Sequence, residues 1–253
     1  MSTTLISIIT PSYNSEMFIK QTILSVLSQT HLNWEMLIVD DCSTDNSVAV
    51  IQKFCQLDKR IKLFILNQNS GPAIARNKAI LEAKGKYIAF LDSDDLWSEK
   101  KLEKQLTFMT TSNSLLSFTS YQRINEVDSI SPSIIHVPSQ ITYNGLLKQT
   151  VIACLSVMYD TSKIGKFYFD TSLQKHEDYQ YWLEILKTIK QADGLDQSLA
   201  YYRTRNNSLS SNKLSAASYV WKIQKDYQHI PFHKRVFYFT SYAYYSTIKH
   251  LFK

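Results

Sequence analysis

The sequence predicts an α/β fold with a mostly parallel sheet, helices on both faces, antiparallel additions in the second half and a helical C-terminal tail. The first observation behind this prediction is that short β-rich runs alternate with helical runs over the first hundred residues. Such alternation is typical of parallel strands joined by right-handed helical crossovers. The second observation is that this alternation stops after about residue 115, where short β-rich runs follow one another with few helical signals.

Apolar periodicity and turn residues then place the elements in order. We expect strands in the first half at residues 5–10, 36–39, 61–66 and 87–91. The intervening helices are indicated by Ile19, Ile23 and Val26 at helical spacing, by the run 47–57, and by Pro72 in a first helical turn. In the second half we expect additional strands at residues 115–124, 133–137 and 155–159, and a strong helix at 176–190.

Composition places the chain among compact globular proteins. It has 253 residues, of which 44% are hydrophobic, and only 5 Gly and 5 Pro, so disorder is not expected. The three cysteines have no metal-ligand spacing and indicate a reducing compartment, with the cytosol as the default. Neither a signal peptide nor an apolar run of about 20 residues is visible. The net charge of +6 selects no partner by itself, and the basic residues form no nucleic-acid motif.

The most informative local feature is the acidic string Asp92-Ser93-Asp94-Asp95 directly after the fourth strand. In an extended chain the side chains of Asp92 and Asp94 point the same way and can share one target. Grouped carboxylates repel one another unless a compensating partner is present, and a divalent metal holding a diphosphate is such a partner. The alternative is an acidic turn that caps a helix starting near Ser98.

The other strand ends favour the ligand-site interpretation. Polar loops at residues 10–14, 40–43 and 67–71 follow the first three strands. Since ligands of parallel α/β sheets bind beyond the carboxyl ends of the strands, four polar loops are expected to converge on one edge. Glu177 and Asp178 lie in the first turn of the later helix, where favourable interaction with the helix dipole is the simpler explanation.

Taken together, the motifs resemble the family 2 inverting glycosyltransferases with their Rossmann-like GT-A fold. The resemblance spans about residues 5–210 and excludes the tail. The matching strings are Ile8-Ile9-Thr10-Pro11-Ser12-Tyr13-Asn14, Val39-Asp40-Asp41-Cys42-Ser43-Thr44-Asp45, Gly71-Pro72-Ala73-Ile74-Ala75-Arg76-Asn77, Phe90-Leu91-Asp92-Ser93-Asp94-Asp95 and Glu177-Asp178-Tyr179. Cys42 departs from the Gly that many relatives carry, which we interpret as a tolerated variation of the turn.

The resemblance implies a nucleotide pocket in the first half of the chain. Thr10, Pro11 and Tyr13 would line it, with the ring of Tyr13 stacking on the base. Asp41 would accept the imide N–H of uracil, which favours a UDP donor over CDP but leaves dTDP open. Arg76 would approach the base or the diphosphate, with a surface position as the alternative.

The resemblance also implies the reacting centre. Asp92 and Ser93 would bind the donor near its ribose, and Asp94 would bind Mn²⁺ or Mg²⁺, with Asp95 either supporting that site or capping a helix. Asp178 would be the general base that deprotonates the acceptor hydroxyl. Weaker acceptor-pocket or supporting roles fall to His176 (a minor candidate for the base), Glu177, Trp97 and Arg203.

The function implied is transfer of a sugar from a nucleotide donor to a saccharide or lipid-linked saccharide acceptor in bacterial surface polysaccharide synthesis. Residues 1–98 would form the nucleotide-binding half, residues 99–210 the acceptor-binding half and residues 211–253 a helical extension. A non-catalytic binding module is the first alternative. A haloacid-dehalogenase-type phosphatase expects Thr or Val where Leu96 stands, and a nucleotidyltransferase needs a Gly-rich loop earlier than Gly71.

The tail combines aromatic and basic residues. After Asp226 no acidic residue occurs, and eight Phe or Tyr residues between 232 and 252 are interleaved with Lys234, Arg235, Lys249 and Lys253. Aromatic rings with basic neighbours suit the interface of an anionic membrane, which would place the enzyme at the inner face of the plasma membrane. Packing on the protein itself or on a second subunit is the alternative, and an oligomer is left open.

Overall fold

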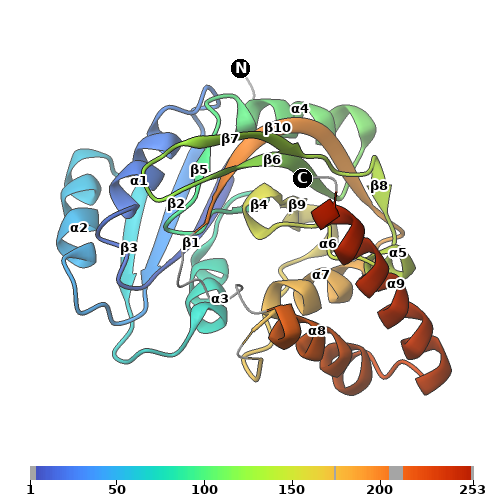
Figure 1. The fold of residues 1–253 in the computed structure, drawn as a ribbon. Coiled ribbons are helices and arrows are strands. Elements are labelled where there is room, and N and C mark those ends of the chain that lie inside the picture. The colour runs from blue at the N-terminus through green and yellow to red at the C-terminus, as the bar shows by residue number, and fades with distance from the viewer. Residues whose placement is uncertain (1–3, 174, 205–212, 252–253) are drawn as a thin grey trace.

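The computed structural model describes residues 4–173, 175–204 and 213–251, and these form one mixed sheet covered by helices on both faces (Figure 1). The sheet has ten strands in the described residues, with β3-β2-β1-β4-β9-β6-β10-β5 as its main order, β7 paired with β6 and β8 with β10. The predicted α/β class with a mostly parallel first half is confirmed.

The first half has the predicted alternation. Its elements are β1 (Ile6–Ser12), α1 (Ile19–Leu27), β2 (Trp34–Asp40), α2 (Ser47–Leu57), β3 (Ile61–Ile65), α3 (Pro72–Glu82) and β4 (Tyr87–Phe90). β1 pairs in parallel with both β2 and β4, and β2 with β3. Every residue of β2 is buried, as expected for a central strand with both faces covered. α1 buries Ile19, Ile23 and Val26, one stripe of the helix surface.

The second half extends the sheet. Its elements are β5 (Leu96–Trp97), α4 (Lys101–Ser112), β6 (Leu116–Ile124), β7 (Ile130–Ile135), β8 (Gln140–Ile141), α5 (Tyr143–Leu146), a 3₁₀ turn (Cys154–Ser156), β9 (Met158–Asp160), α6 (Thr161–Ile164), α7 (Glu177–Thr188) and β10 (Ala192–Arg203). The strand predicted at 155–159 is shorter, because its first residues form the 3₁₀ turn. The strand predicted at 133–137 begins earlier, at Ile130.

The expectation that these strands are antiparallel additions is right for most pairs and wrong for one. β9 is antiparallel to both β4 and β6, and so lies inside the sheet rather than at its flank. β10, which the sequence pattern did not indicate, pairs with β6 in parallel. Its alternation is irregular, with register shifts between Leu195 and Ala200, which explains why it was missed.

The two faces of the sheet carry separate hydrophobic clusters. One cluster packs α1, α2 and α4 against side chains such as Ile8, Met36 and Ala89. The other packs α3 and α7 against Ile9, Leu37 and Phe90. Figure 1 shows α4 over the β6–β10 part of the sheet and α7, α8 and α9 on its opposite side. Trp182 of α7 packs on Phe90, the last residue of β4, with ring centroids 5.5 Å apart, which holds α7 next to the carboxyl end of β4.

The tail is helical where it is described, with α8 (Lys213–Lys222), a π-helical turn η2 (Ile223–Tyr227) and α9 (Phe232–Leu251). Val220 and Ile223 are part of the core that contains α7, and Tyr238 and Tyr242 of α9 pack against it. The opposite side of α9 carries exposed Phe237 and Tyr244, 56% and 62% accessible. In the described part of the chain, no helix is both long and apolar enough to span a membrane.

Candidate active site

The carboxyl ends of β1, β2 and β4 meet at one edge of the sheet, because these strands are parallel neighbours. The loops that follow β1 and β2 are joined by hydrogen bonds. The N–H of Thr44 donates to Oδ1 of Asn14 at 2.8 Å, and the N–H of Asn14 donates to Oγ of Ser43 at 2.9 Å. The polar loops thus converge on a common edge, as the sequence predicted.

The residues expected around the nucleotide differ in accessibility. Tyr13 is 48% exposed, so its ring is open to a ligand, and Pro11 is partly buried. Thr10 is fully buried, and its Oγ1 has no hydrogen-bond partner among the described residues. Tyr13 and Pro11 can line a pocket directly, whereas the side chain of Thr10 lies below the surface.

Asp41 organises the loop that leads into α3. Its two carboxylate oxygens accept the N–H groups of Ser70 and Gly71, each at 2.7 Å. Gly71 has φ 90°, a conformation that glycine adopts without steric cost. Each carboxylate oxygen keeps a second lone-pair site, so Asp41 can still accept one more N–H.

Arg76 forms an internal bridge between two halves of the site. This buried guanidinium donates to Asp92 at 2.7 Å and to Glu177 at 2.8 Å. Burial disfavours its charge, but Asp92, then Cys154 and Glu177, outweigh that effect and hold the pKa of Arg76 above its usual range. Arg76 is therefore not the surface residue of the alternative interpretation, and its contact with a base or diphosphate stays a prediction.

The acidic string is turned rather than extended, so the geometric premise of the prediction is wrong. The chain turns at Ser93 and Asp94, closed by a hydrogen bond from the N–H of Asp95 to the carbonyl of Asp92 at 3.2 Å. The carbonyl of Ser93 accepts the hydroxyl proton of Thr22. Burial, then the charges of Asp94 and Asp92, raise the pKa of Asp95 well above its ordinary value.

Asp95 does not cap a helix, since α4 begins only at Lys101. Its buried carboxylate accepts the main-chain N–H of Arg203 at 2.7 Å instead, tying the acidic turn to the end of β10. Asp92, with 28% of its side chain exposed, and partly buried Asp94 keep access to the surface. Among the described residues, no three Asp, Glu, His or Cys side chains are grouped as metal ligands.

Asp178, the predicted base, lies in the first turn of α7. Burial raises the pKa of Asp178, and Glu177 adds to this rise, whereas His176 and Arg76 oppose it. His176 has φ 58° and precedes the helix, with its ring 6.0 Å from that of Tyr219. Because Arg76 contacts both Asp92 and Glu177, it brings the acidic turn and the first turn of α7 into one site.

Two residues of this site carry no signal in the sequence. Cys154 is buried, and burial raises the pKa of its thiol; Arg76 opposes this effect, while Asp92, Asp178 and Glu177 add to it. The ring of Phe169 lies 5.3 Å from the guanidinium of Arg76 and stacks on Tyr181 with ring centroids 3.9 Å apart. Phe169 thus forms the apolar support of the Arg76 bridge.

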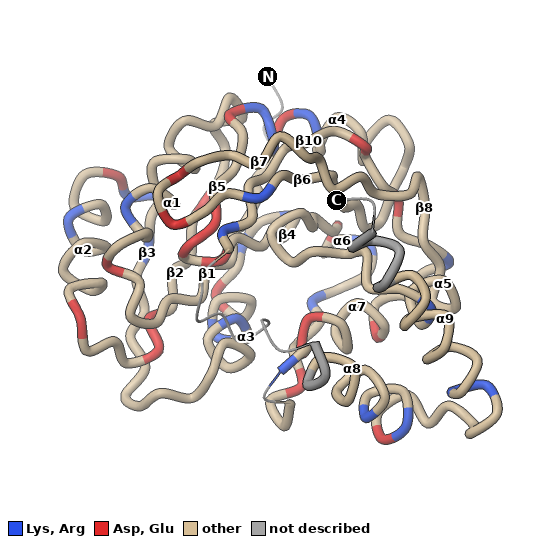
Figure 2. Tube along the Cα trace, in the orientation of Figure 1, with Lys and Arg blue, Asp and Glu red and all other residues tan. Residues whose placement is uncertain are grey.

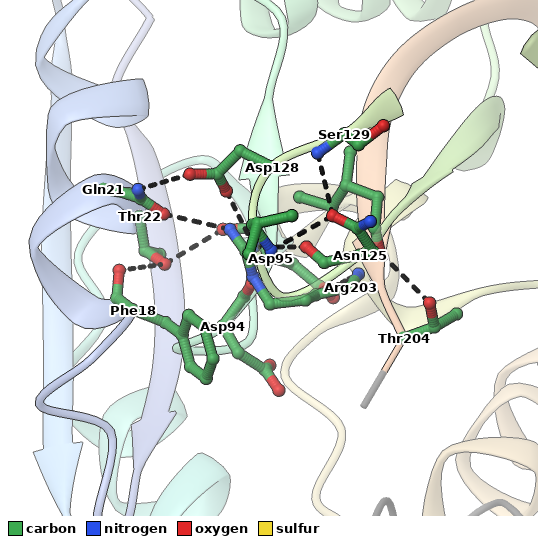
Figure 3. Close-up of polar contacts among 12 residues, drawn as sticks. Phe18, Gln21, Thr22, Asp94, Asp95, Asn125, Asp128, Ser129, Arg203 and Thr204 are labelled. Atoms are coloured by element: carbon green, nitrogen blue, oxygen red, sulfur yellow. Dashed lines mark hydrogen bonds and ion pairs between the residues drawn. The ribbon is translucent and has the colours of Figure 1, made fainter. Parts of the chain in front are cut away.

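Two weaker candidates lie inside the protein. Trp97 is buried, donates from Nε1 to the carbonyl of Leu155 at 2.8 Å, and has the amine of Lys101 3.7 Å from its ring centre. Trp97 is therefore a core residue rather than a wall of the acceptor pocket. Arg203 lies next to Asp94 and Asp95 of the acidic turn (Figure 3), and residues 205–212, which follow it closely in the chain, lie outside the described residues.

The family model "Glycosyl transferase family 2" matches residues 7–169. The putative teichuronic acid biosynthesis glycosyltransferase TuaG of Bacillus subtilis is 44% identical over 94% of this chain and 94% of its own length. The UDP-Glc:alpha-D-GlcNAc-diphosphoundecaprenol beta-1,3-glucosyltransferase WfgD of Escherichia coli is 39% identical over 98% of this chain and 96% of its own. Neither the phosphatase nor the non-catalytic alternative is favoured by these matches.

Solved structures agree with the fold. The S. aureus TarS 1-349 complex with UDP-GlcNAc has a TM-score of 0.70 and 24% identity, covering 86% of this chain and 64% of that chain. The mannosyltransferase PcManGT of Pyrobaculum calidifontis with GDP-Man and Mn²⁺ has a TM-score of 0.67 and 14% identity, covering 89% of this chain and 64% of that chain. The fold is of the GT-A type, and this chain is a glycosyltransferase of family 2.

Proposed function

We propose that this enzyme transfers a sugar from a UDP-sugar to a hydroxyl of a saccharide acceptor, with inversion, in the synthesis of a cell-surface polysaccharide. The observation that carries the proposal is the Arg76 bridge, which unites the acidic turn after β4 with Asp178 at the start of α7. The named activities of the relatives TuaG and WfgD support the surface-polysaccharide setting.

Donor binding would use the edge formed by the first three strands. The exposed ring of Tyr13 offers a stacking surface for the base. Asp41, already fixed by two main-chain N–H groups, would accept the imide N–H of uracil with a remaining lone pair. Cytosine lacks that proton, whereas thymine keeps it, so UDP is preferred over CDP and dTDP is the second candidate.

A divalent cation fits the chemistry of the acidic turn. The side chains of Asp92 and Asp94 carry hard oxygen atoms and keep access to the surface, which suits a divalent cation. Asp94 would hold Mn²⁺ or Mg²⁺, with the diphosphate and water as further ligands. When bound, the metal supplies Lewis acidity that stabilises the charge of the leaving nucleoside diphosphate.

Asp178 would act on the acceptor. As the acceptor oxygen attacks the anomeric carbon, the bond from that carbon to the diphosphate breaks on the opposite side, and the hydroxyl proton passes to the Asp178 carboxylate. Burial raises the pKa of Asp178, which makes its carboxylate a stronger base than an exposed aspartate. Glu177 is engaged with Arg76, so it is placed to orient this helix turn rather than to accept the proton.

The metal assignment is tested with Asp94→Ala in calorimetric titrations of UDP with and without Mn²⁺. We expect the variant to lose the metal-dependent part of UDP binding together with turnover. Asp193→Ala is the control, because it removes a carboxylate on β10 that accepts a hydrogen bond from Gln191. This variant should bind UDP as the unmodified protein does. UDP binding by Asp94→Ala with an unchanged metal requirement would contradict the proposal.

We further propose that α9 contacts an anionic membrane where a lipid-linked acceptor is presented. All charged residues of α9 are basic (Figure 2), and Phe232, Val236, Phe237, Tyr244 and Tyr245 are exposed. Each Lys or Arg near an anionic leaflet contributes about 1 kcal/mol to binding. The name of WfgD gives a diphosphoundecaprenol-linked acceptor for that enzyme, and this supports a membrane-bound acceptor for the present chain as well.

Flotation with anionic liposomes tests this contact. Phe237→Ser/Tyr244→Ser should reduce binding, because both side chains are exposed and absent from the core that holds α9. Tyr201→Ser, on β10 and away from the tail, is the control for loss of an aromatic ring. Equal flotation of the double variant and the unmodified protein would exclude α9 as the contact.

A further inference from the structure

Arg203, the last residue of β10, lies at the centre of a buried set of contacts beneath the acidic turn (Figure 3). Its side chain has no solvent exposure. Nε donates to the carbonyl of Asp94 at 2.7 Å, and Nη1 donates to the carbonyl of Asn125 at 2.8 Å and pairs with Asp128 at 2.7 Å. Nη2 donates to Gln21 at 3.0 Å.

These partners come from three separate parts of the chain. Gln21 belongs to α1, Asp94 to the acidic turn, and Asn125 and Asp128 to the turn between β6 and β7. Gln21 also donates to Asp128 at 2.6 Å, which closes a ring of contacts around the guanidinium. The position of the Asp94 main chain therefore depends on residues that lie on both sides of the site.

The contact with Asp94 is made to its carbonyl, so it fixes the peptide that carries the carboxylate. Only arginine offers a planar fork of five donors, and here three of its nitrogens are engaged in different directions. A lysine would supply a single charged nitrogen, so it could not make these hydrogen bonds in three different directions. The main-chain N–H of the same residue also fixes the Asp95 carboxylate.

We propose that Arg203 is a positioning residue for metal binding: together with Asp128 it sets the main chain at Asp94 so that the Asp94 carboxylate faces the diphosphate-bound cation. This inference rests on the proposed role of Asp94. In this proposal Arg203 and Asp128 act through the main chain of Asp94 and are not themselves ligands. Partners that orient a metal ligand in this way typically change metal affinity by about 10–100-fold when they are removed.

The test measures the Mn²⁺ concentration that half-saturates UDP binding, by calorimetry, in Arg203→Lys and Asp128→Asn. Asn is chosen because residue 128 has φ 62°, which asparagine tolerates better than most residues. Asp128→Asn removes the charge of a side chain that is 42% exposed and should leave the fold intact. Asp196→Asn is the matched control. Asp196 also lies on β10 and its carboxylate is 2.8 Å from the ring of His136, which follows β7 and is not a hydrogen-bond partner of Arg203.

We expect half-saturation to need about 10–100-fold more Mn²⁺ in Arg203→Lys and several-fold more in Asp128→Asn. At saturating Mn²⁺ the UDP affinity of both variants should return to that of the unmodified protein, and Asp196→Asn should show no change. Unchanged half-saturation in both variants, even with a lower Tm, would overturn the proposal and leave Arg203 a purely structural residue. Metal-independent UDP binding by the unmodified protein would instead overturn the assignment of Asp94 itself.

Discussion

Replacing Arg76 by methionine tests the bridge that unites the candidate site. The Arg76 side chain is 7% exposed, and its partners Asp92 and Glu177 are 28% and 12% exposed. Removing one member of a buried ion pair costs about 3–5 kcal/mol, because it leaves an uncompensated charge. Asp92 keeps partial contact with water, so we expect the lower end, about 3 kcal/mol. For a chain of this size that corresponds to a fall in Tm of about 6–12 °C.

Urea denaturation followed by circular dichroism gives the free energy of unfolding for this variant. Arg76→Met/Glu177→Gln should be less destabilised than the sum of the two single variants, because the second change removes one of the stranded charges. Lys78→Met is the control: Lys78 pairs with Glu82 at 2.7 Å and both side chains are 37% exposed, so its loss should cost about 1 kcal/mol or less. A loss below about 1 kcal/mol for Arg76→Met, or strict additivity with Glu177→Gln, would refute the reasoning.

Two further predictions concern Asp178 and Cys42. Asp178→Asn should keep UDP affinity while transfer slows by about 10²–10⁴-fold, measured by initial rates, and near-normal transfer would remove Asp178 from the role of base. Burial raises the pKa of Asp178. As pH falls, its carboxylate therefore becomes protonated, and unable to act as a base, at a higher pH than an exposed aspartate would. The acid limb of the pH profile of kcat/KM should therefore lie at a higher pH than the pKa of an exposed aspartate. A limb in the ordinary aspartate range would argue against Asp178 as the base. Cys42 has φ 62°, which costs a non-glycine residue about 1–2 kcal/mol, whereas glycine loses about 0.5–1 kcal/mol more chain entropy on folding. Cys42→Gly should therefore gain about 0.5–1 kcal/mol in urea denaturation. Cys42→Ala should show no gain in the free energy of unfolding. Equal stability of the Gly and Ala variants would contradict backbone strain at residue 42.

The first half of the fold was predictable because its signals are local. Ile19, Ile23 and Val26 identify α1 from a single stretch of sequence, and they are buried in the structure. Pro72 similarly marks the first turn of α3. Strands such as β2, with all residues buried, are visible as short apolar runs between turn residues. Each of these elements is specified within about ten residues.

The contacts that build the site were not predictable, because they join residues far apart in the chain. Arg76 and Glu177 are 101 positions apart, and Arg203 and Asp94 are 109 apart. The parallel pairing of β10 with β6 likewise depends on tertiary packing rather than on a local pattern. The motif predicted that Asp92 and Asp94 belong to one acidic site, but the hydrogen bond that turns the chain there has no sequence signal.

Two buried arginines from different elements hold the acidic turn. Arg76, on α3, pairs with the carboxylate of Asp92, whereas Arg203, on β10, binds the carbonyl of Asp94. Arg76 therefore compensates the charge of a carboxylate directly, whereas Arg203 fixes the main chain through a neutral carbonyl oxygen. Burial, followed by the charges of Asp94 and Asp92, raises the pKa of Asp95, and Arg203 opposes this rise. If Asp94 binds the cation as proposed, these two contacts would hold the acidic turn in place before the metal arrives, which is what reversible binding of a metal with a nucleotide requires.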